Sequence, residues 1–275
     1  MSKLKALLLT QGMHGMISQV EGLAKALNLD YKHQTIKLKT LWNYIPPKFT
    51  PITDNILSEN FTCNAKIIIS CGRKSVIPSI ALKKKFGKNI INIHIQDPKV
   101  KLSNFDFIVA PEHDGLSGKN VLTSKGAIHY LTNEELNGNE NYLKSRINNQ
   151  KKIVTLIIGG PTKHYDYNNI TIDNIFLKIK QNFLEKNYQL IVVPSIRTPQ
   201  HIIDKAKNYF NEDQVIIPTV DKKAYLCSLK KADHIIVTCD STSMISEAAI
   251  TGKPIYIAQM PAIKNNERFK SFFNL

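Results

Sequence analysis

The sequence predicts an α/β protein with two Rossmann-like domains that face each other across a cleft. Apolar runs rich in isoleucine, valine and leucine alternate with amphipathic segments along the whole chain. Such runs are typical of parallel strands that helices bury on both faces. The alternation starts afresh after a polar stretch near the middle, and a chain of 275 residues is long enough for two domains of ordinary size.

In the first half, an apolar run over residues 4–10 predicts a strand, and the periodicity over residues 16–27 predicts a helix. A second helix is expected to end near Gly87, where a glycine follows the last apolar residue. Other apolar runs of strand length are bounded by glycine, proline or polar residues. These further strands are expected over residues 31–38, 66–71, 89–95, 105–110 and 120–122.

Residues 132–150 are polar and lack an apolar face, so we expect them to form a linker between domains 1–131 and 151–275. The strand–helix alternation then resumes. Strands are expected over residues 152–158, 189–193, 215–217, 234–239 and 255–258, and helices over 173–186, from 201 onward, over 224–230, and from about 241 to a stop at Gly252-Lys253-Pro254.

The formal net charge of +15 suggests an anionic partner, but the lysines are spread along the chain without a basic stripe. We therefore do not expect nucleic-acid binding. No apolar run approaches the about 20 residues that a membrane-spanning helix needs. We expect a cytoplasmic protein, with peripheral contact to anionic lipid at the inner face of a membrane as a further hypothesis, which salt-sensitive vesicle binding would test.

Three loops of the second half follow predicted strands, where ligands bind in parallel α/β sheets. Their candidate anion-binding residues are Gly159, Gly160, Thr162 and Lys163 in the first loop, Arg197 in the second, and Asp240, Ser241, Thr242 and Ser243 in the third. Glycines allow close backbone approach, cations neutralise phosphate, and a helix that begins after the third loop offers unpaired N–H groups. Each loop taken alone is equally typical of an ordinary turn or helix cap.

Glu247 lies about one and a half turns into the helix that begins near Ser241. At that distance a carboxylate can reach the ribose hydroxyls of a nucleotide whose diphosphate sits at the helix start. The spacing alone is equally compatible with a solvated helix residue.

The first half offers polar residues with a less specific meaning. His94 and Asp97 end one predicted strand, and Glu112 and His113 end the next. Histidines and carboxylates at one sheet edge are candidate catalytic bases, although the same segments are good turns, and no spacing indicates a metal site. Gly12, His14 and Arg73 follow neighbouring strands and are expected to line the same cleft.

The segment 240–254 resembles the donor-site signature of GT-B glycosyltransferases and UDP-N-acetylglucosamine 2-epimerases. That resemblance implies diphosphate contact at Ser241 to Ser243 and ribose contact at Glu247. Five segments in order are similar to the mitochondrial fission ELM family, whose plant members recruit a dynamin-related protein to mitochondria and whose bacterial members are often described as nucleoside-diphosphate-sugar epimerase-like. The segments are 94–98, 105–114, 158–165, 194–199 and 240–247.

The resemblance implies a GT-B-like fold and a nucleoside-diphosphate sugar as substrate, without a cofactor or a metal. The leading hypothesis is epimerisation of the sugar or its transfer to an unknown acceptor, with a lipid-linked molecule as one candidate acceptor. The alternative is a non-catalytic adaptor that recruits a protein partner. Proteins of the GT-B fold usually finish with a helix that crosses back to the first domain, and the end of the sequence at 269–275 comes earlier than this helix predicts, so we expect an end that is either truncated or unusually short.

Overall fold

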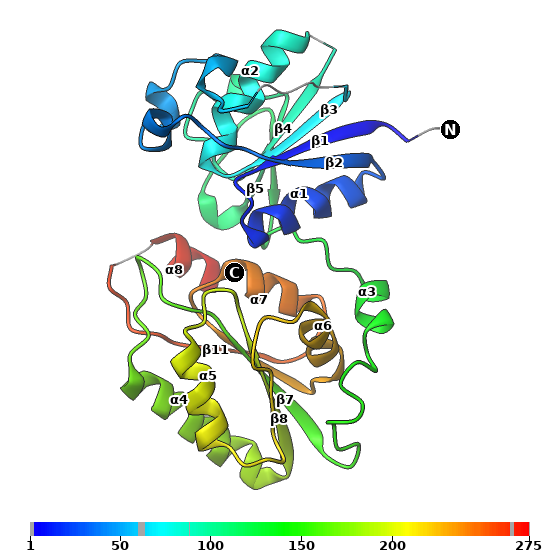
Figure 1. Ribbon diagram of the computed structural model, residues 1–275, viewed down its shortest axis with the longest axis vertical. Coiled ribbons are helices and arrows are strands. Elements are labelled where there is room, and N and C mark those ends of the chain that lie inside the picture. Colours follow the sequence, from blue (N-terminus) through cyan, green and yellow to red (C-terminus); the bar gives the residue numbers. More distant parts are fainter. Residues whose placement is uncertain (1–2, 60–63, 88, 265–266, 275) are drawn as a thin grey trace. The chain divides into compact units, whose positions relative to one another are not determined.

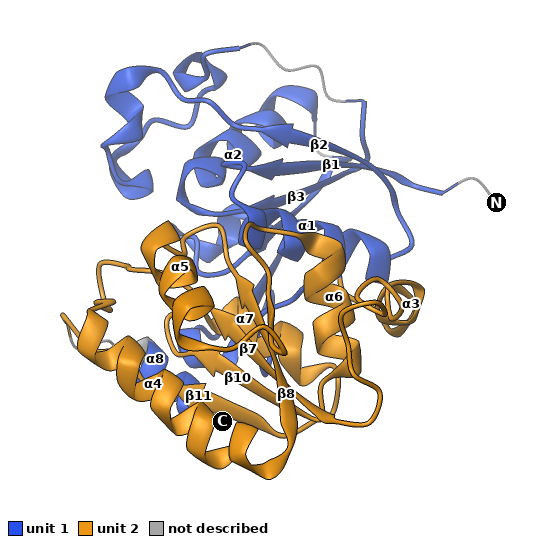
Figure 2. Cartoon of the chain, turned by 60° about the horizontal axis from the view of Figure 1, so that its bottom comes forward, with its two compact units in different colours: residues 1–130, 268–275 blue, residues 131–267 orange. Residues whose placement is uncertain are grey.

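The computed structural model describes residues 3–59, 64–87, 89–264 and 267–274. The chain forms two compact units (Figure 2): unit 1 comprises residues 1–130 and 268–275, and unit 2 comprises residues 131–267. Each unit is an α/β layer structure built on its own sheet. The predicted α/β class with two parallel sheets is confirmed.

Unit 1 has a six-stranded sheet in the order β2-β1-β3-β4-β5-β6, with all neighbours parallel. Its elements are β1 (Lys5–Thr10), α1 (His14–Ala26), β2 (Asp30–Thr35), β3 (Ile67–Cys71), α2 (Val76–Phe86), β4 (Ile91–Ile95), β5 (Phe107–Pro111) and β6 (Val121–Ser124). Short 3-10 turns at Thr40–Asn43, Pro47–Phe49, Asp54–Ile56, Arg73–Ser75, Leu102–Asn104 and Glu112–Asp114 complete the unit.

Alternate residues of β1 face the two sides of this sheet, as the period of a strand requires. Leu7 and Leu9 pack in the cluster that contains residues of α2, and Ala6 and Leu8 pack in the cluster that contains residues of α1. The sheet is therefore buried on both faces by helices (Figure 1), which explains why every residue of its central strand β3 is buried.

Unit 2 has a five-stranded parallel sheet in the order β11-β10-β7-β8-β9. Its elements are α3 (Asn133–Gly138), β7 (Lys152–Ile158), α4 (Asn169–Asn182), β8 (Tyr188–Pro194), α5 (Gln200–Tyr209), β9 (Val215–Ile216), α6 (Lys222–Lys231), β10 (His234–Thr238), α7 (Thr242–Ala249) and β11 (Ile255–Ala258), with a 3-10 turn at Leu184–Lys186. The helices α4 and α5 lie together on one side of the sheet (Figure 1).

Two features of the domain organisation differ from the sequence-based expectation. Residues 132–150 belong to unit 2, where Leu136 and Leu143 are buried and α3 packs against α6. Helix α8 (Glu267–Phe273) is present, and from residue 268 onward it belongs to unit 1, where the rings of Phe272 and His113 lie 5.0 Å apart. A final helix of seven residues is therefore present.

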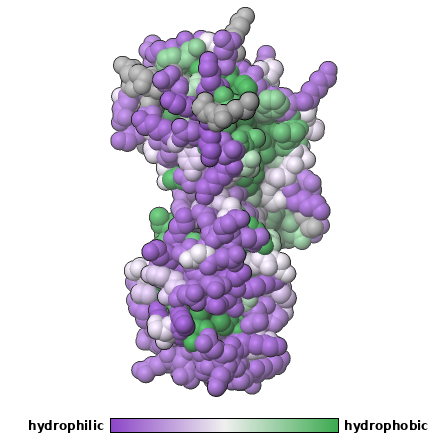
Figure 3. All heavy atoms as spheres, turned by 90° about the vertical axis from the view of Figure 1, so that its right-hand side faces the viewer, coloured by the Kyte–Doolittle hydropathy of each residue, from purple (hydrophilic) through white to green (hydrophobic). Residues whose placement is uncertain are grey.

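Hydrophilic residues predominate in each unit on the face drawn in Figure 3. This agrees with a composition in which 37 lysine and arginine residues outnumber 22 aspartate and glutamate residues. Of the helices in the described part of the chain, none combines the length and the hydropathy that a membrane-spanning helix requires.

Candidate functional site

The carboxyl edge of the unit 2 sheet brings together the three loops that the sequence singles out. Strands β8 and β9 lie on one side of β7, and β10 and β11 lie on the other, so the strand order reverses between β7 and β10. Such a reversal opens a crevice where ligands bind in parallel sheets. The loops after β7 and β10 meet there, because the Gly159 N–H donates a 2.8 Å hydrogen bond to Thr238 Oγ1.

Asp240 is the centre of this edge. Its side chain is 0% exposed, and Arg197 Nη2 donates a 2.7 Å hydrogen bond to Oδ2. The Gly160 N–H also donates to Oδ2, at 3.3 Å, while Thr238 Oγ1 donates to Oδ1 at 2.7 Å and the Tyr167 hydroxyl donates to the same oxygen. Four donors, from the loops after β7 and β8 and from the end of β10, therefore compensate one buried carboxylate.

These contacts give Asp240 a different role from the one expected. A carboxylate accepts hydrogen bonds and repels phosphate, so Asp240 is unsuited to direct diphosphate contact. It holds Arg197 instead, whose side chain remains 34% exposed. The guanidinium has five N–H donors. The Nη2 group donates to Asp240, and the other N–H groups can donate to an anion.

Gly159 and Gly160 are required by close packing against the other two loops. A Cβ at Gly159 would lie 2.2 Å from both carboxylate oxygens of Asp240. A Cβ at Gly160 would lie 1.9 Å from the Arg197 carbonyl oxygen. Any side chain at these positions would displace the Asp240–Arg197 pair.

Helix α7 begins directly after Asp240, and Ser241 rather than Asp240 is its N-cap, because Ser241 Oγ accepts a hydrogen bond from the Met244 N–H at 3.4 Å. Thr242 and Ser243 form the first turn and are half-buried. The N–H groups of a first helical turn, together with the helix dipole, favour an anion at this position. Arg197 contacts Asp240, and the start of α7 follows Asp240 directly in the sequence. Both groups that can bind an anion are therefore next to this carboxylate.

Glu247 is buried, and its Oε2 accepts a 2.8 Å hydrogen bond from the Tyr225 hydroxyl of α6. The contact fixes a carboxylate within the first two turns of α7. The reading of Glu247 as a solvated helix residue is therefore wrong, and a fixed carboxylate is what recognition of a diol requires.

The loop after β7 closes on itself through Thr162. Thr162 Oγ1 accepts hydrogen bonds from the N–H groups of His164 and Tyr165, both at 3.1 Å. Lys163 is exposed at the tip of this turn. The pKa of His164 is lowered, first by burial and then by the nearby charges of Lys163 and Lys264, so His164 is a neutral donor or acceptor rather than a cation at neutral pH.

Sequence reasoning missed two tyrosines of this site. Tyr167 is buried, and burial followed by the charge of Asp240 raises its pKa far above the usual range, so it stays a hydroxyl donor. Tyr225 lies on α6, 22 positions before Glu247. The alternation of Tyr165 and Tyr167 after a glycine pair is a weak sequence signal for Tyr167. No local sequence pattern marks Tyr225.

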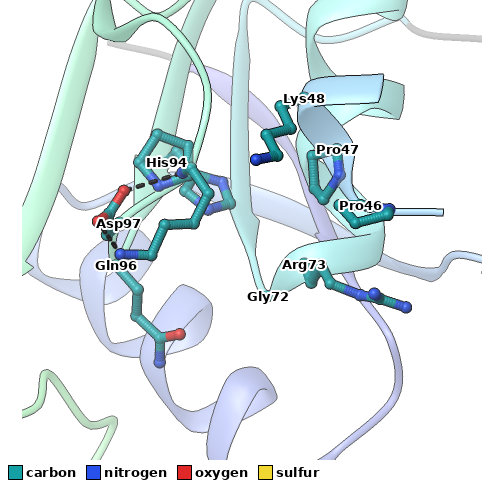
Figure 4. A pocket seen from close by; sticks show the side chains of 10 residues that line it. Pro46, Pro47, Lys48, Gly72, Arg73, His94, Gln96 and Asp97 are labelled. Carbon is teal, nitrogen blue, oxygen red and sulfur yellow. Dashed lines mark hydrogen bonds and ion pairs between the residues drawn. The ribbon is translucent and has the colours of Figure 1, made fainter. Parts of the chain in front are cut away.

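Unit 1 contains a separate pocket of about 490 Å³ at the carboxyl ends of β3 and β4 (Figure 4). Its lining includes three of the residues selected from the sequence: Arg73, His94 and Asp97. Lys48 extends into the pocket from the segment that carries Pro46 and Pro47 (Figure 4). Asp97 Oδ2 accepts a 2.5 Å hydrogen bond from Lys99 Nζ, and Arg73 donates to the Asn43 carbonyl oxygen.

His94 is the buried end of this pocket. Its Nδ1 lies 2.9 Å from Ser70 Oγ, and its ring lies 5.1 Å from that of Phe105. Burial lowers the pKa of His94 to about 3, against a smaller opposing effect of Asp97. The ring is therefore neutral at physiological pH and a weak base, since a general base is most effective with a pKa near the working pH.

Acidification is expected to destabilise the protein through His94. The folded-state pKa of about 3 lies below the ordinary value of 6.5, so between these values the unfolded chain binds a proton that the folded chain excludes. Stability from this group is complete above pH 6.5 and is lost as the pH falls toward 3. Between pH 7 and pH 5 the loss is about 2 kcal/mol, and His94→Asn should lose that much less in urea titrations at the two pH values. Equal losses for wild type and variant would show that His94 is not the proton-excluding group.

The other expected residues of unit 1 lie elsewhere. Glu112 is exposed on the 3-10 turn after β5, and His113 is buried against Phe272 of α8. Gly12 adopts φ +82° in the loop after β1, and His14 begins α1 with its ring 6.3 Å from that of Tyr130. Within the described residues, no three histidine, cysteine, aspartate or glutamate side chains are grouped as a metal site.

Known proteins with similar sequences share most of this chain. A profile of the family described as Mitochondrial fission ELM1 matches residues 14–275. An uncharacterized protein of Rickettsia prowazekii (strain Madrid E) is 28% identical over 235 residues, which are 71% of this chain and 65% of that protein. The Mitochondrial fission protein ELM1 of Arabidopsis thaliana is 24% identical over 223 residues, 70% of this chain and 51% of that protein. The chain thus spans between about half and two thirds of the length of these relatives.

Solved structures with the same fold include a UDP-GlcNAc 2-epimerase from Neisseria meningitidis bound to UDP-GlcNAc, with a TM-score of 0.57, 12% identity, and coverage of 98% of this chain and 85% of that one. ADP-heptose LPS heptosyltransferase II of E. coli has a TM-score of 0.54, 9% identity, and coverage of 92% and 84%. At such identities the likeness shows the fold alone, which is of the GT-B type. The profile match over residues 14–275 shows that the chain belongs to the Mitochondrial fission ELM1 family.

Proposed function

We propose that the chain binds a nucleoside-diphosphate sugar at the carboxyl edge of the unit 2 sheet and transfers or epimerises the sugar. The observation that carries the proposal is the Arg197–Asp240 pair beside the start of α7. A buried carboxylate holds a partly exposed guanidinium next to unpaired helix N–H groups, which is a preorganised site for a diphosphate.

The remaining groups of the site support the same ligand. Glu247, whose carboxylate is held by the Tyr225 hydroxyl, is the residue that we assign to the ribose hydroxyls, from which it would accept hydrogen bonds. Lys163 is exposed in the loop after β7 and adds positive charge. The fold is also that of a UDP-GlcNAc 2-epimerase solved with UDP-GlcNAc bound.

In a transfer, an acceptor oxygen attacks the anomeric carbon, the bond from that carbon to the diphosphate oxygen breaks, and the electron pair leaves on the diphosphate. Arg197, Lys163 and the start of α7 would stabilise that developing charge without a metal. The acceptor's proton needs a base, for which His94, Asp97, Glu112 and His113 of unit 1 remain the candidates. His94 is a weak base, because burial lowers its pKa to about 3.

A thermal-shift panel of UDP, GDP, CMP and dTDP with their sugar conjugates tests the binding. We expect one nucleotide to stabilise the protein, by about 2.7 kcal/mol at a hundred times its dissociation constant. Glu247→Ala should raise that constant about tenfold or more, because hydrogen bonds to a charged group are lost. The exposed Glu212 provides a control, Glu212→Ala, that should respond like wild type. No shift with any nucleotide, or equal shifts in the two variants, would rule the assignment out.

The alternative function is that of an adaptor that recruits a protein partner, and the name of the Arabidopsis relative favours it. An adaptor can keep the fold and the nucleotide site without turnover. The two functions separate when the stabilising nucleotide sugar is incubated with wild type and Arg197→Ala. Release of nucleotide, or conversion to the epimeric nucleotide sugar, by wild type alone indicates an enzyme, whereas neither product from either protein, despite binding, indicates an adaptor.

A further inference from the structure

Residues 41–52 of unit 1 expose an unusual number of large apolar side chains. Leu41 is 64% exposed, Tyr44 80%, Phe49 67% and Ile52 37%. Single exposed apolar residues are normal on a protein surface. Four within one short segment form a cluster, and exposed apolar clusters commonly mark a contact with a partner or a membrane.

The same segment supplies one wall of the unit 1 pocket, through Pro46, Pro47 and Lys48. The lining of this pocket carries three cations, Lys48, Arg73 and Lys99, and one carboxylate, Asp97. That carboxylate already pairs with Lys99 at 2.5 Å. In the part of the chain that the structure describes, neither Lys48 nor Arg73 has a carboxylate within ion-pair distance.

Arg73 extends away from the centre of the pocket (Figure 4) and donates to the Asn43 carbonyl oxygen, which leaves Lys48, among the described residues, as an uncompensated cation within it. A cation in a concave pocket attracts an anion, because the low-dielectric walls concentrate its field. The Lys48 ammonium lies 4.7 Å from the centre of the Phe49 ring, so the charge and the apolar cluster are adjacent (Figure 4 shows Lys48 within the pocket). A volume of about 490 Å³ suits a small polar head group and is too small for acyl chains as well.

The backbone around the pocket is also unusual. Gly72 has φ +92°, and the non-glycine residues Gln96 and Lys99 have φ +81° and +57°. Left-handed conformations at non-glycine residues cost free energy and gather at binding and active sites. Gln96 and Lys99 both lie on the loop after β4, which lines the pocket, and this supports a binding role for it.

We propose that this pocket binds the phosphate of an anionic phospholipid head group while residues 41–52 lie in the membrane interface. Tyrosine and phenylalanine are favoured at that interface, and lysine places its charge at the level of the phosphates. The pocket and the segment both belong to unit 1, so the proposal does not rest on nucleotide binding by unit 2. If the protein is a transferase, the site would bring it to a lipid-linked acceptor.

Flotation with phosphatidic acid–phosphatidylcholine vesicles tests the proposal, with Trp42 fluorescence as a second readout. Trp42 is the single tryptophan of the chain and lies within the segment, so a change in its emission reports on this region. The net charge of +15 will attract the protein to any anionic vesicle, and matched controls must remove that effect. The control for a lost charge is at Lys119, which is exposed in unit 1 outside the pocket lining. The control for a lost apolar side chain is at Ile170, which is 75% exposed on unit 2.

We expect Lys48→Ala to raise the vesicle dissociation constant about tenfold more than Lys119→Ala, because only Lys48 contacts the phosphate. Phe49→Ser should weaken vesicle binding about tenfold relative to Ile170→Ser, because Phe49 enters the membrane interface and Ile170 does not. Arg197→Ala should bind vesicles like wild type, which separates this site from the nucleotide site.

Three results would overturn the proposal. One is equal weakening by Lys48→Ala and Lys119→Ala, which indicates a diffuse charge effect. Another is loss of vesicle binding in Arg197→Ala, which places the anion site in unit 2. The third is a saturable Trp42 response to glycerol 1-phosphate or inorganic phosphate with no response to vesicles, which identifies a free phosphate as the ligand instead of a lipid.

Discussion

Replacing Asp240 with alanine is expected to lower the free energy of unfolding by about 3 kcal/mol. The side chain of Asp240 is fully buried and accepts from Arg197, Gly160, Thr238 and Tyr167. Its removal leaves these donors without their acceptor, and each buried unsatisfied group costs about 1–3 kcal/mol. The expected loss lies at the low end of the range for broken buried pairs because Arg197, 34% exposed, can turn toward water.

Urea unfolding followed by circular dichroism measures this change, and Asp204→Ala is the matched control. Asp204 pairs with Lys207 at 3.4 Å on the surface of α5, and its side chain is 55% exposed. Such a surface pair contributes about 0–1 kcal/mol, so the control should be close to wild type. Equal stability of the two variants would mean that Asp240 does not hold the three loops together.

The second large effect is expected for Gly160→Ala. The new Cβ would lie 1.9 Å from the Arg197 carbonyl oxygen and 2.3 Å from its carbonyl carbon. These are backbone atoms and cannot turn away, so the loops after β7 and β8 must separate. We expect a loss of about 3 kcal/mol, at the upper end of the range for overpacked sites, together with loss of stabilisation by nucleotide, because Arg197 moves with its backbone.

Gly138→Ala is the control for this substitution, because a Cβ at Gly138 meets no atom within 4 Å and the residue ends helix α3. Alanine should leave that position unchanged or stabilise it by about 0.5–1 kcal/mol. A Gly160→Ala protein with wild-type stability and nucleotide response would show that the loops are not packed as described.

The fold could be predicted because its main signal is local. Runs such as Leu7–Leu9 and Ile67–Ile69 are apolar on both faces of the strand. This pattern is typical of a strand that helices cover on both sides of the sheet. The domain boundary could not be placed as well. Leu136 and Leu143 are isolated apolar residues in a polar stretch, and only their packing in unit 2 shows that the segment is part of that unit.

The position of the candidate site followed from the rule that loops after parallel strands share an edge, and the structure does bring Gly159, Arg197 and Ser241 to one edge. The roles of single residues did not follow. Asp240 holds Arg197 from 43 positions away, and Tyr225 holds Glu247 through a contact between two helices. Contacts of this kind depend on tertiary packing and leave no local pattern.

His94 shows a further limit of sequence reasoning. Its position after an apolar run, before Gln96 and Asp97, suggested a base at a sheet edge. Burial, which lowers its pKa to about 3, depends on neighbours such as Ser70 and Phe105 from other parts of the unit. The chemical type of a residue could be read from the sequence, but its protonation state could not.

The most direct test of the central claim is calorimetric titration with the nucleoside diphosphate that stabilises the protein most. Wild type should bind it, Arg197→Ala should bind it at least about tenfold more weakly, and Arg146→Ala should bind like wild type. Arg146 is an exposed arginine of unit 2 that contacts the Ile216 carbonyl oxygen, so it controls for loss of charge. Equal affinity of the two arginine variants, or no binding by wild type, would contradict a diphosphate site at the carboxyl edge of unit 2.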